Sequence, residues 1–415
     1  MKLLYLIFNT LLLMSCHKEP LLSPCKLPDC SDTIKPKYTG LQLVWQKTLR
    51  PDNQYSPGNS ITLTDDYVCF QYDYTGDEKI LMMYKADTSS QRTDITYGGV
   101  HDVFYHPGVG LIVIDEYSVY TGSDLNSLHK IATVPSCGRF RLFNRLIGDY
   151  LYLTDVRVEC EGYTAVFKMN VRTGAWYTDR LQKDSDYQDI KVNTLDGPAY
   201  IMNQGDTLYT YVKYVKIGDK PYITLETIRD HQTLWIDSNF VTTTLQENLI
   251  QYKGATIAAS TRAINYLEPV SGLVIWSTPP IARASWPTWL ASNVFLEDEK
   301  LCFLDRGHFV ELDANTGSIL YDSPELHFPT SNSMMSYFDG VFYWTAASGG
   351  YSWIYGLRYS DKKLVLKMRS PNDGKAPYYS DPNFAINGLH IDPKTRLAYT
   401  ADGFFAQCYR IPEKY

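Results

Sequence analysis

Residues 308–321 read HFVELDANTGSILY, and this stretch decides the fold. Apolar and polar residues alternate on both sides of a turn of the form Asp-x-x-Thr-Gly, which runs from Asp313 to Gly317. Alternation gives each strand one apolar face, and glycine takes the positive φ of a tight turn without strain. The stretch therefore predicts a β-hairpin.

Weaker copies of this hairpin recur along most of the chain. Alternating strands precede turn residues at 80–90, 119–127, 165–174, 223–231, 264–272, 308–321 and 354–363. The spacing between successive copies is about 40 to 56 residues, the period of a four-stranded propeller blade. The repeat therefore predicts an all-β protein, a β-propeller of four-stranded antiparallel blades.

The two ends of the sequence complete the count of blades. Residues 388–391, 397–400 and 406–411 predict three last strands, and residues 41–49 can supply the missing fourth. A ring closed by strands from both termini leaves no open end. We expect eight blades in one domain over 41–415, with seven as the alternative if the unit around Val119 divides differently. The region Asp184 to Phe240 is expected to carry extended loops.

Three turns resemble the repeats of pyrroloquinoline-quinone-like propellers, whose pattern is Asp-x-x-Thr-Gly-x-x-x-Trp. They lie at Asp313–Tyr321, Glu268–Trp276 and Thr173–Trp176, and the first two keep the spacing. The resemblance implies that the aromatic residue docks one blade against the next. Quinone-dependent members of this family hold Ca²⁺ with acidic residues, and many carry adjacent cysteines. This chain has no adjacent cysteines, so we expect neither a cofactor nor a metal.

Composition agrees with an all-β globular protein and argues against one class of partner. The chain has 415 residues, of which 34 are tyrosine, a residue that suits half-buried pleated surfaces. Its net charge is -7 and its pI is about 5.6. Such a chain offers no general attraction to phosphates, so nucleic acid is not an expected partner.

The N-terminus predicts a lipoprotein signal peptide over residues 1–16. A short apolar run ends in Leu-Met-Ser-Cys, which resembles the bacterial lipobox with Cys16 as the lipidated residue. An ordinary secretory signal is the alternative. Residues 17–40 are rich in Pro, Lys, Ser and Asp, and they predict a flexible tether. Because His17 is not Asp, we expect an extracytoplasmic protein anchored by lipid at the outer membrane or cell surface.

The remaining cysteines fit an oxidising compartment. Cys137 and Cys160 are expected in loops at the same end of one blade, and we predict a disulfide between them. Cys69, Cys302 and Cys408 lie in apolar strand patterns and are expected to be small buried side chains.

Candidate ligand residues are expected where successive blades connect, because those segments gather at one face of a propeller. Aromatic and arginine side chains favour binding surfaces. The candidates are Tyr55, His101, Asp102, Arg139, Arg141, Arg283, Trp286, Trp289, Tyr378, Tyr379, Asp381 and Asn383. The alternative is that they are solvated loop residues or aromatics that pack blades together.

Two functional classes remain open from the sequence. The first is a non-catalytic, lipid-anchored scaffold or binding protein of the bacterial cell envelope that contacts protein partners through its loop faces. The second is a glycan- or small-molecule-binding protein, or an extracytoplasmic enzyme, with a site at the channel mouth. We favour the scaffold, as a monomer, because no set of acid, base and nucleophile emerges.

Overall fold

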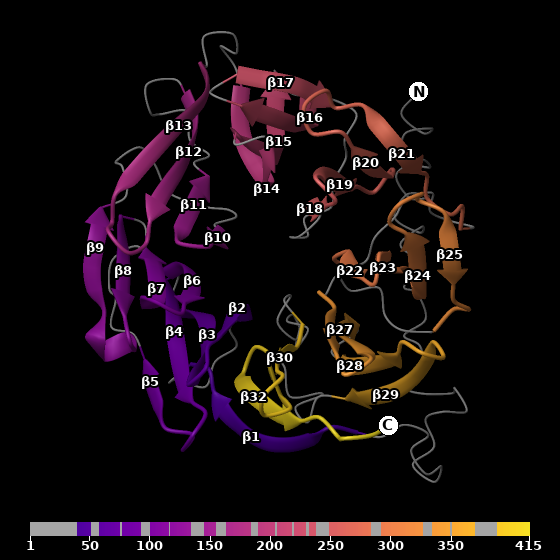
Figure 1. Ribbon diagram of the computed structural model, residues 1–415. Coiled ribbons are helices and arrows are strands. Elements are labelled where there is room, and N and C mark those ends of the chain that lie inside the picture. Colours follow the sequence, from indigo (N-terminus) through magenta and orange to yellow (C-terminus); the bar gives the residue numbers. More distant parts are fainter. Residues whose placement is uncertain are drawn as a thin grey trace, which may run out of the picture. The chain divides into compact units, whose positions relative to one another are not determined.

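The computed structural model describes residues 40–50, 58–74, 77–92, 100–115, 117–133, 145–154, 163–183, 190–203, 206–217, 220–229, 232–237, 249–283, 292–326, 334–348, 351–369 and 388–415. The chain divides into two compact units, Met1–Thr39 and Gly40–Tyr415. All described residues belong to the second unit. It is an all-β unit whose four-stranded antiparallel sheets are the blades of a β-propeller (Figure 1).

Seven blades are each built from four strands that follow one another in sequence. The first four are β2–β5 (Gly58–Leu63, Tyr67–Tyr74, Asp77–Tyr84, Ser90–Arg92), β6–β9 (Val100–His106, Gly110–Asp115, Ser118–Gly122, His129–Thr133), β10–β13 (Arg145–Ile147, Tyr150–Thr154, Tyr163–Asn170, Trp176–Lys183) and β14–β17 (Ile190–Asn203, Asp206–Ile217, Lys220–Arg229, Gln232–Asp237). The next three are β18–β21 (Leu249–Tyr252, Ala255–Ala259, Ile264–Leu267, Val274–Thr278), β22–β25 (Phe295–Glu297, Lys300–Asp305, His308–Asp313, Ile319–Asp322) and β26–β29 (Ser336–Phe338, Val341–Ser348, Tyr351–Arg358, Lys363–Arg369).

One further four-stranded sheet joins the two ends of the unit. It has the order β1-β32-β31-β30, with β1 at Gln42–Thr48 and β30, β31 and β32 at His390–Asp392, Leu397–Ala401 and Phe405–Arg410. In Figure 1 the indigo β1 lies beside the yellow β32. The predicted count of eight blades is therefore corrected. Seven blades are continuous in sequence, and the last sheet is a composite of strands from both ends that closes the ring.

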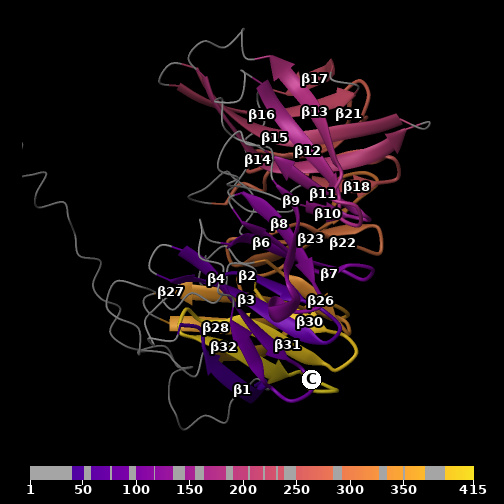
Figure 2. The same cartoon turned by 90° about the vertical axis from the view of Figure 1, so that its left-hand side faces the viewer.

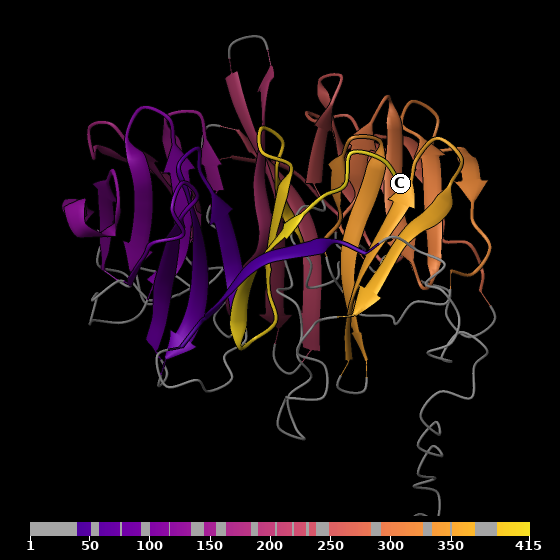
Figure 3. The same cartoon turned by 90° about the horizontal axis from the view of Figure 1, so that it is seen from below.

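The sheets surround a centre in Figure 1, and the ring is seen from the side in Figure 2 and Figure 3. The first strand of each continuous blade lies inside and the fourth lies at the rim. In the stretch that predicted the hairpin, Phe309, Val310, Glu311 and Leu312 are all buried, although simple alternation would bury only every second residue. A middle strand of a blade is covered on both faces, since neighbouring blades pack against each side.

The region Asp184 to Phe240 differs from its prediction. It forms a complete blade, β14–β17, with strands of 14, 12, 10 and 6 residues, and not extended loops. Its many Tyr, Val, Ile and Thr residues favour strands over most of its length. The first two strands are long for globular proteins, and their length obscured the regular spacing of turns.

Hydrophobic clusters lie between blades. One cluster joins the β18–β21, β22–β25 and β26–β29 blades around Phe309, Phe342 and Trp344. Another joins the β2–β5 blade to the composite sheet around Phe70 and Tyr399. Burial of apolar surface contributes about 25 cal/mol per Å², so these seams are where packing stabilises the ring.

Tryptophans at the rim dock one blade against the turn of the next. Trp276 in β21 donates a hydrogen bond from Nε1 to the carbonyl oxygen of Ala314 at 3.2 Å, in the turn between β24 and β25. A Cβ at Gly317 would lie 2.5 Å from this indole, and Gly317 has a φ of +71°. The docking role that the family resemblance implied is therefore present at this seam.

A second tryptophan repeats the arrangement one blade earlier. Trp235 in β17 donates from Nε1 to the carbonyl oxygen of Pro269 at 2.9 Å, and a Cβ at Gly272 would lie 2.5 Å from its ring. The glycine is needed twice over, for its positive φ of +70° and for the close approach of the indole.

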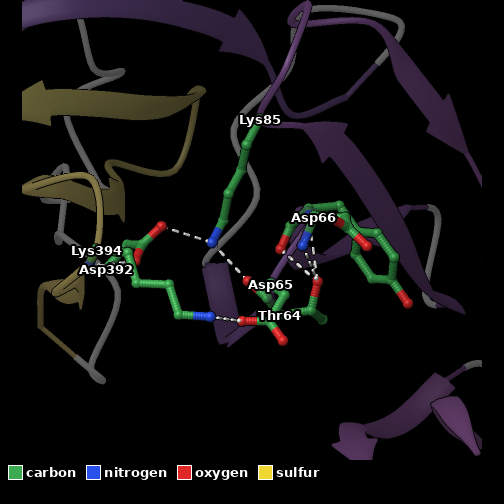
Figure 4. Close-up of polar contacts among 7 residues, drawn as sticks. Thr64, Asp65, Asp66, Lys85, Asp392 and Lys394 are labelled. Atoms are coloured by element: carbon green, nitrogen blue, oxygen red, sulfur yellow. Dashed lines mark hydrogen bonds and ion pairs between the residues drawn. The ribbon is translucent and has the colours of Figure 1, made fainter. Parts of the chain in front are cut away.

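The seam beside the closing sheet is held by the polar latch, formed by Thr64, Asp65, Lys85, Asp392 and Lys394 (Figure 4). Lys85 Nζ lies 2.8 Å from Asp392 Oδ2 and also donates to the carbonyl oxygen of Thr64. Lys394 Nζ lies 2.6 Å from Asp65 Oδ1. The latch thus ties the β2–β5 blade to the composite sheet.

Cys69, Cys302 and Cys408 are buried free thiols, as predicted. Burial raises the pKa of the Cys302 thiol to about 12 and that of Cys408 to about 12. The described helix is a short 3-10 turn at Leu125–Ser127. Within the ranges given above, no helix has the length and apolar character needed to cross a bilayer.

Candidate functional site

The strand directions define two ends of each blade. In the β22–β25 blade, the turn at Arg306–Gly307 and the chain leaving β25 lie at one end, which we call the connection face. The turns after β22 and β24 lie at the other end, and we call it the turn face. Segments that join successive blades start and end at the connection face, where the ligand residues were predicted.

The structure places three of the predicted ligand residues. His101 and Asp102 are the second and third residues of β6, so they belong to an inner strand and not to a connecting loop as expected. Arg283 lies between β21 and β22 at the connection face. The other candidates fall outside the described residues: Tyr55, Arg139, Arg141, Trp286, Trp289, Tyr378, Tyr379, Asp381 and Asn383. The lipidation residue Cys16 and the predicted pair Cys137 and Cys160 fall outside them as well.

Arg283 is held by two carboxylates of the β22–β25 blade. Its Nε lies 2.9 Å from Asp305 Oδ2, and its Nη2 lies 2.7 Å from Asp322 Oδ1. His308 Nδ1 lies 2.6 Å from the carbonyl oxygen of Ser323 and 3.6 Å from Asp322 Oδ1. Arg283 therefore joins the β18–β21 blade to the β22–β25 blade, and its guanidinium group is already paired with these two carboxylates.

Asp305 is available to Arg283 because of the turn that follows it. At the corresponding turns of two other sheets, Asp115 and Asp402 accept hydrogen bonds from backbone N–H groups, such as those of Ser118 and Phe405. After Asp305, Arg306 and Gly307 both have positive φ, 46° and 84°. This conformation closes a two-residue hairpin without a side-chain cap.

The environment of Asp305 is unusual for a carboxylate. Its side chain is 1% exposed, and burial raises the pKa of this carboxyl in spite of the Arg283 hydrogen bond and charge that lower it. Its Oδ1 has no hydrogen-bond partner in the described part of the chain. Chemically this oxygen can accept one hydrogen bond from a donor, and Arg283 and Asp322 complete a polar patch around it. Across the described residues, no group of three or more His, Cys, Asp or Glu side chains is placed to hold a metal ion.

A second feature lies on the outer strands of three consecutive blades, β17, β21 and β25 (Figure 1). Aliphatic side chains there face solvent: Leu273 is 70% exposed, Val274 54% and Ile319 47%. We call this surface the apolar rim, and its members are Ile236, Leu273, Val274, Ile275, Ile319 and Leu320. Exposed apolar patches of this kind mark interaction sites on soluble proteins.

The docking tryptophans connect the members of the apolar rim. Ile236 follows Trp235, and Leu273 follows Gly272, which abuts the Trp235 ring. Ile275 precedes Trp276, and Ile319 comes two residues after Gly317, which abuts the Trp276 ring. Strands β21 and β25 therefore each begin beside the tryptophan of the preceding outer strand, which places the exposed aliphatic residues on neighbouring blades.

The apolar rim also differs from the remaining outer strands in charge. Strands β17, β21 and β25 have the sequences QTLWID, VIWST and ILYD, without lysine or arginine. The other outer strands all contain one or more basic residues: QLVWQKT in β1, SQR in β5, HKIAT in β9, WYTDRLQK in β13 and KLVLKMR in β29. Charged residues, lysine above all, protect sheet edges from pairing with other chains.

Sequence reasoning missed this surface. Ile319 was interpreted only as part of an alternating strand, and Leu273 was given no role. The signal that could have revealed them is the absence of lysine and arginine from three successive fourth strands. That comparison needs the strand order within each blade.

Comparisons with known proteins agree with the fold and show little beyond it. No family model matches the chain, and no curated protein matches it. Among solved structures, the chain is similar to the computationally designed Ika8 protein (TM-score 0.57, 12% identity, 90% of this chain and 100% of that chain). It is similar to BamB from Moraxella catarrhalis (TM-score 0.54, 9% identity, 91% and 99%) and to the Dos1 propeller (TM-score 0.58, 9% identity, 89% and 95%).

Proposed function

We propose that the chain is a non-catalytic propeller scaffold of the bacterial cell envelope that binds protein partners. The observation that carries this proposal is the apolar rim, where aliphatic side chains of three successive outer strands face solvent. Leaving this much apolar surface in water costs about 25 cal/mol per Å², and a partner that covers it recovers that free energy. The similarity to BamB is a similarity of fold and supports the scaffold reading only in that respect.

Site-specific cross-linking tests the scaffold function. A photoreactive amino acid at Ile275 or Ile319, introduced in cells that make this protein, is expected to give a discrete adduct with another envelope protein. The matched control is Val44 in β1, which is 43% exposed on an outer strand that contains a lysine. If adducts formed equally from Val44, or if none formed from Ile275 and Ile319, the scaffold function would be wrong.

The anchor is proposed to be lipid on Cys16, with residues 17–40 as the tether. The apolar run before Cys16 and the Leu-Met-Ser-Cys sequence support it. The variant Cys16→Ala is expected to move from the membrane fraction to the soluble fraction, measured by immunoblot of fractionated cells. Cys69→Ala is the control for loss of a cysteine, because Cys69 is buried in the propeller. Unchanged membrane association of Cys16→Ala would exclude the lipid anchor.

A further inference from the structure

We propose that the apolar rim binds an extended segment of a partner protein by adding it as a further β-strand to the edge of β21 or β25. This inference rests on the proposed scaffold function and specifies how the partner is held. The segment that fits is short, carries aliphatic side chains on alternate residues, and has basic residues at its ends.

The edges of both strands are open in the described part of the chain. Strand β21 pairs with β20 alone, and β25 pairs with β24 alone. An outermost strand has backbone N–H and C=O groups on its free side, and an added strand satisfies them. The backbone therefore supplies affinity that does not depend on the partner's side chains.

Side chains at these edges select an apolar strand. Val274 and Ile275 flank the edge of β21, and Ile319 and Leu320 flank that of β25; all four are about half exposed. Side chains that face one another across an antiparallel pair of strands are close enough to pack and stabilise the pairing. The side chains of a bound strand alternate between the two faces, so every second residue can contact this apolar surface.

The edges of β21 and β25 differ in charge from those of the other outer strands. The charged residue of β25, Asp322, is its last residue and pairs with Arg283, which also pairs with Asp305, and β21 has no charged residue. A bound strand thus meets no unpaired charge at the centre of the contact. The net charge of the whole chain is -7, which favours basic residues at the ends of the segment, where they stay in solvent.

The length of the strands limits the length of the segment. Strand β21 has five residues and β25 has four. A strand rises by about 3.3 Å per residue, so a central stretch of about five residues covers either edge. Antiparallel addition is expected, because antiparallel pairing is slightly more stable per residue.

A designed peptide tests the proposal directly. The probe is acetyl-Lys-Val-Thr-Val-Thr-Val-Lys-amide with a fluorophore, titrated with purified residues 17–415 and followed by fluorescence anisotropy. Two further probes carry either glutamate in place of both lysines or N-methyl groups on alternate residues. N-methylation removes the donors along one edge of the peptide and leaves its side chains in place. We expect binding to weaken at least tenfold on N-methylation and several-fold with glutamate ends.

Protein variants locate the edge and control for folding. Ile275→Lys and Ile319→Lys are each expected to weaken the edge that they alter, and the double variant is expected to abolish binding. Val44→Lys places the same charge on the outer strand β1 and is expected to bind as the wild type does. Thermal unfolding of each variant shows whether the propeller remains folded.

The outcomes separate this proposal from the scaffold function. Equal binding of the N-methylated peptide, equal loss in Val44→Lys, or no binding of the unmodified peptide would overturn strand addition. If cross-links from Ile275 and Ile319 still identified an envelope partner, the scaffold function would stand without it. If those cross-links failed as well, both would be wrong.

Discussion

Replacing Trp276 by alanine is expected to lower the free energy of unfolding by about 3–5 kcal/mol, the usual cost of removing a buried large aromatic side chain. The indole is mostly buried between two blades, packs against Tyr266, and donates to the carbonyl oxygen of Ala314. Alanine would leave a cavity at this seam and a carbonyl group without its donor. Urea unfolding followed by the fluorescence of the remaining tryptophans and by circular dichroism measures the effect.

The neighbouring residue provides the matched control. Ile275 precedes Trp276 in β21 but faces solvent, so Ile275→Ala is expected to change stability by less than about 0.5 kcal/mol. Gly317→Ala approaches the same seam from the other blade: the new Cβ would lie 2.5 Å from the Trp276 ring at a φ of +71°. It is expected to destabilise the protein. Equal stability of Trp276→Ala and Ile275→Ala would show that the tryptophan does not dock the blades.

The sequence predicted those parts of the fold that local chemistry determines. The hairpin at residues 308–321 forms as β24 and β25, because alternation and the Asp-x-x-Thr-Gly turn act over a few residues. The closing strand was also visible, since Trp45 lies in an alternating run that had no partner near it in sequence. It pairs with Cys408 of β32.

Contacts between blades were harder to predict. Trp235 docks on Pro269 as Trp276 docks on Ala314, but the turn before Trp235 lacks the Thr-Gly pair, and its role could not be recognised. The β14–β17 blade was expected to carry extended loops, because its first two strands, with 14 and 12 residues, exceed the usual length. The docking contact of Trp235 does not follow from local propensity, since it depends on which surfaces the ring brings together.

The candidate site was likewise predictable only in part from the sequence. Arg283 lies in the segment between β21 and β22, and its role as a ligand residue stays a prediction. Its partner Asp305 could not be named, because the pairing depends on a turn geometry in which Arg306 and Gly307 both have positive φ. Exposure of the apolar rim likewise depends on which strand of each blade is outermost.

Breaking the polar latch is expected to destabilise the protein by about 3–5 kcal/mol, the usual cost of leaving one charge of a buried pair without its partner. The variant is Lys85→Met, which keeps most of the side-chain volume and removes the charge. Lys85 and Asp392 are 9% and 6% exposed, and they join residues 307 positions apart in sequence. Urea unfolding at pH 7 gives the magnitude. Hydrogen exchange is expected to become faster in β2–β5 and in β30–β32, on the two sides of the seam.

The pH dependence gives the sign of the electrostatic contribution. Burial acts to raise the pKa of Asp392, but hydrogen bonds from Lys85, Thr395 and the Lys394 amide, with the Lys85 charge, lower it below the ordinary value of 3.8. A carboxyl whose pKa is depressed on folding stabilises the protein above its unfolded pKa, and this contribution is lost as pH falls through the folded pKa. The difference in stability between wild type and Lys85→Met is therefore expected to narrow below about pH 4.

Two controls distinguish the buried pair from general effects of charge. Lys394→Met removes a lysine whose partner Asp65 is exposed, so the change is expected to stay within about 1 kcal/mol. The double variant Lys85→Met/Asp392→Leu removes both buried charges and is expected to recover part of the loss, since an apolar pair often replaces a buried ion pair at little cost. If Lys394→Met were as harmful as Lys85→Met, or if the double variant were worse than the single one, the buried pair would not be what holds this seam. In that case the seam would depend on the packing of Phe70 and Tyr399 instead.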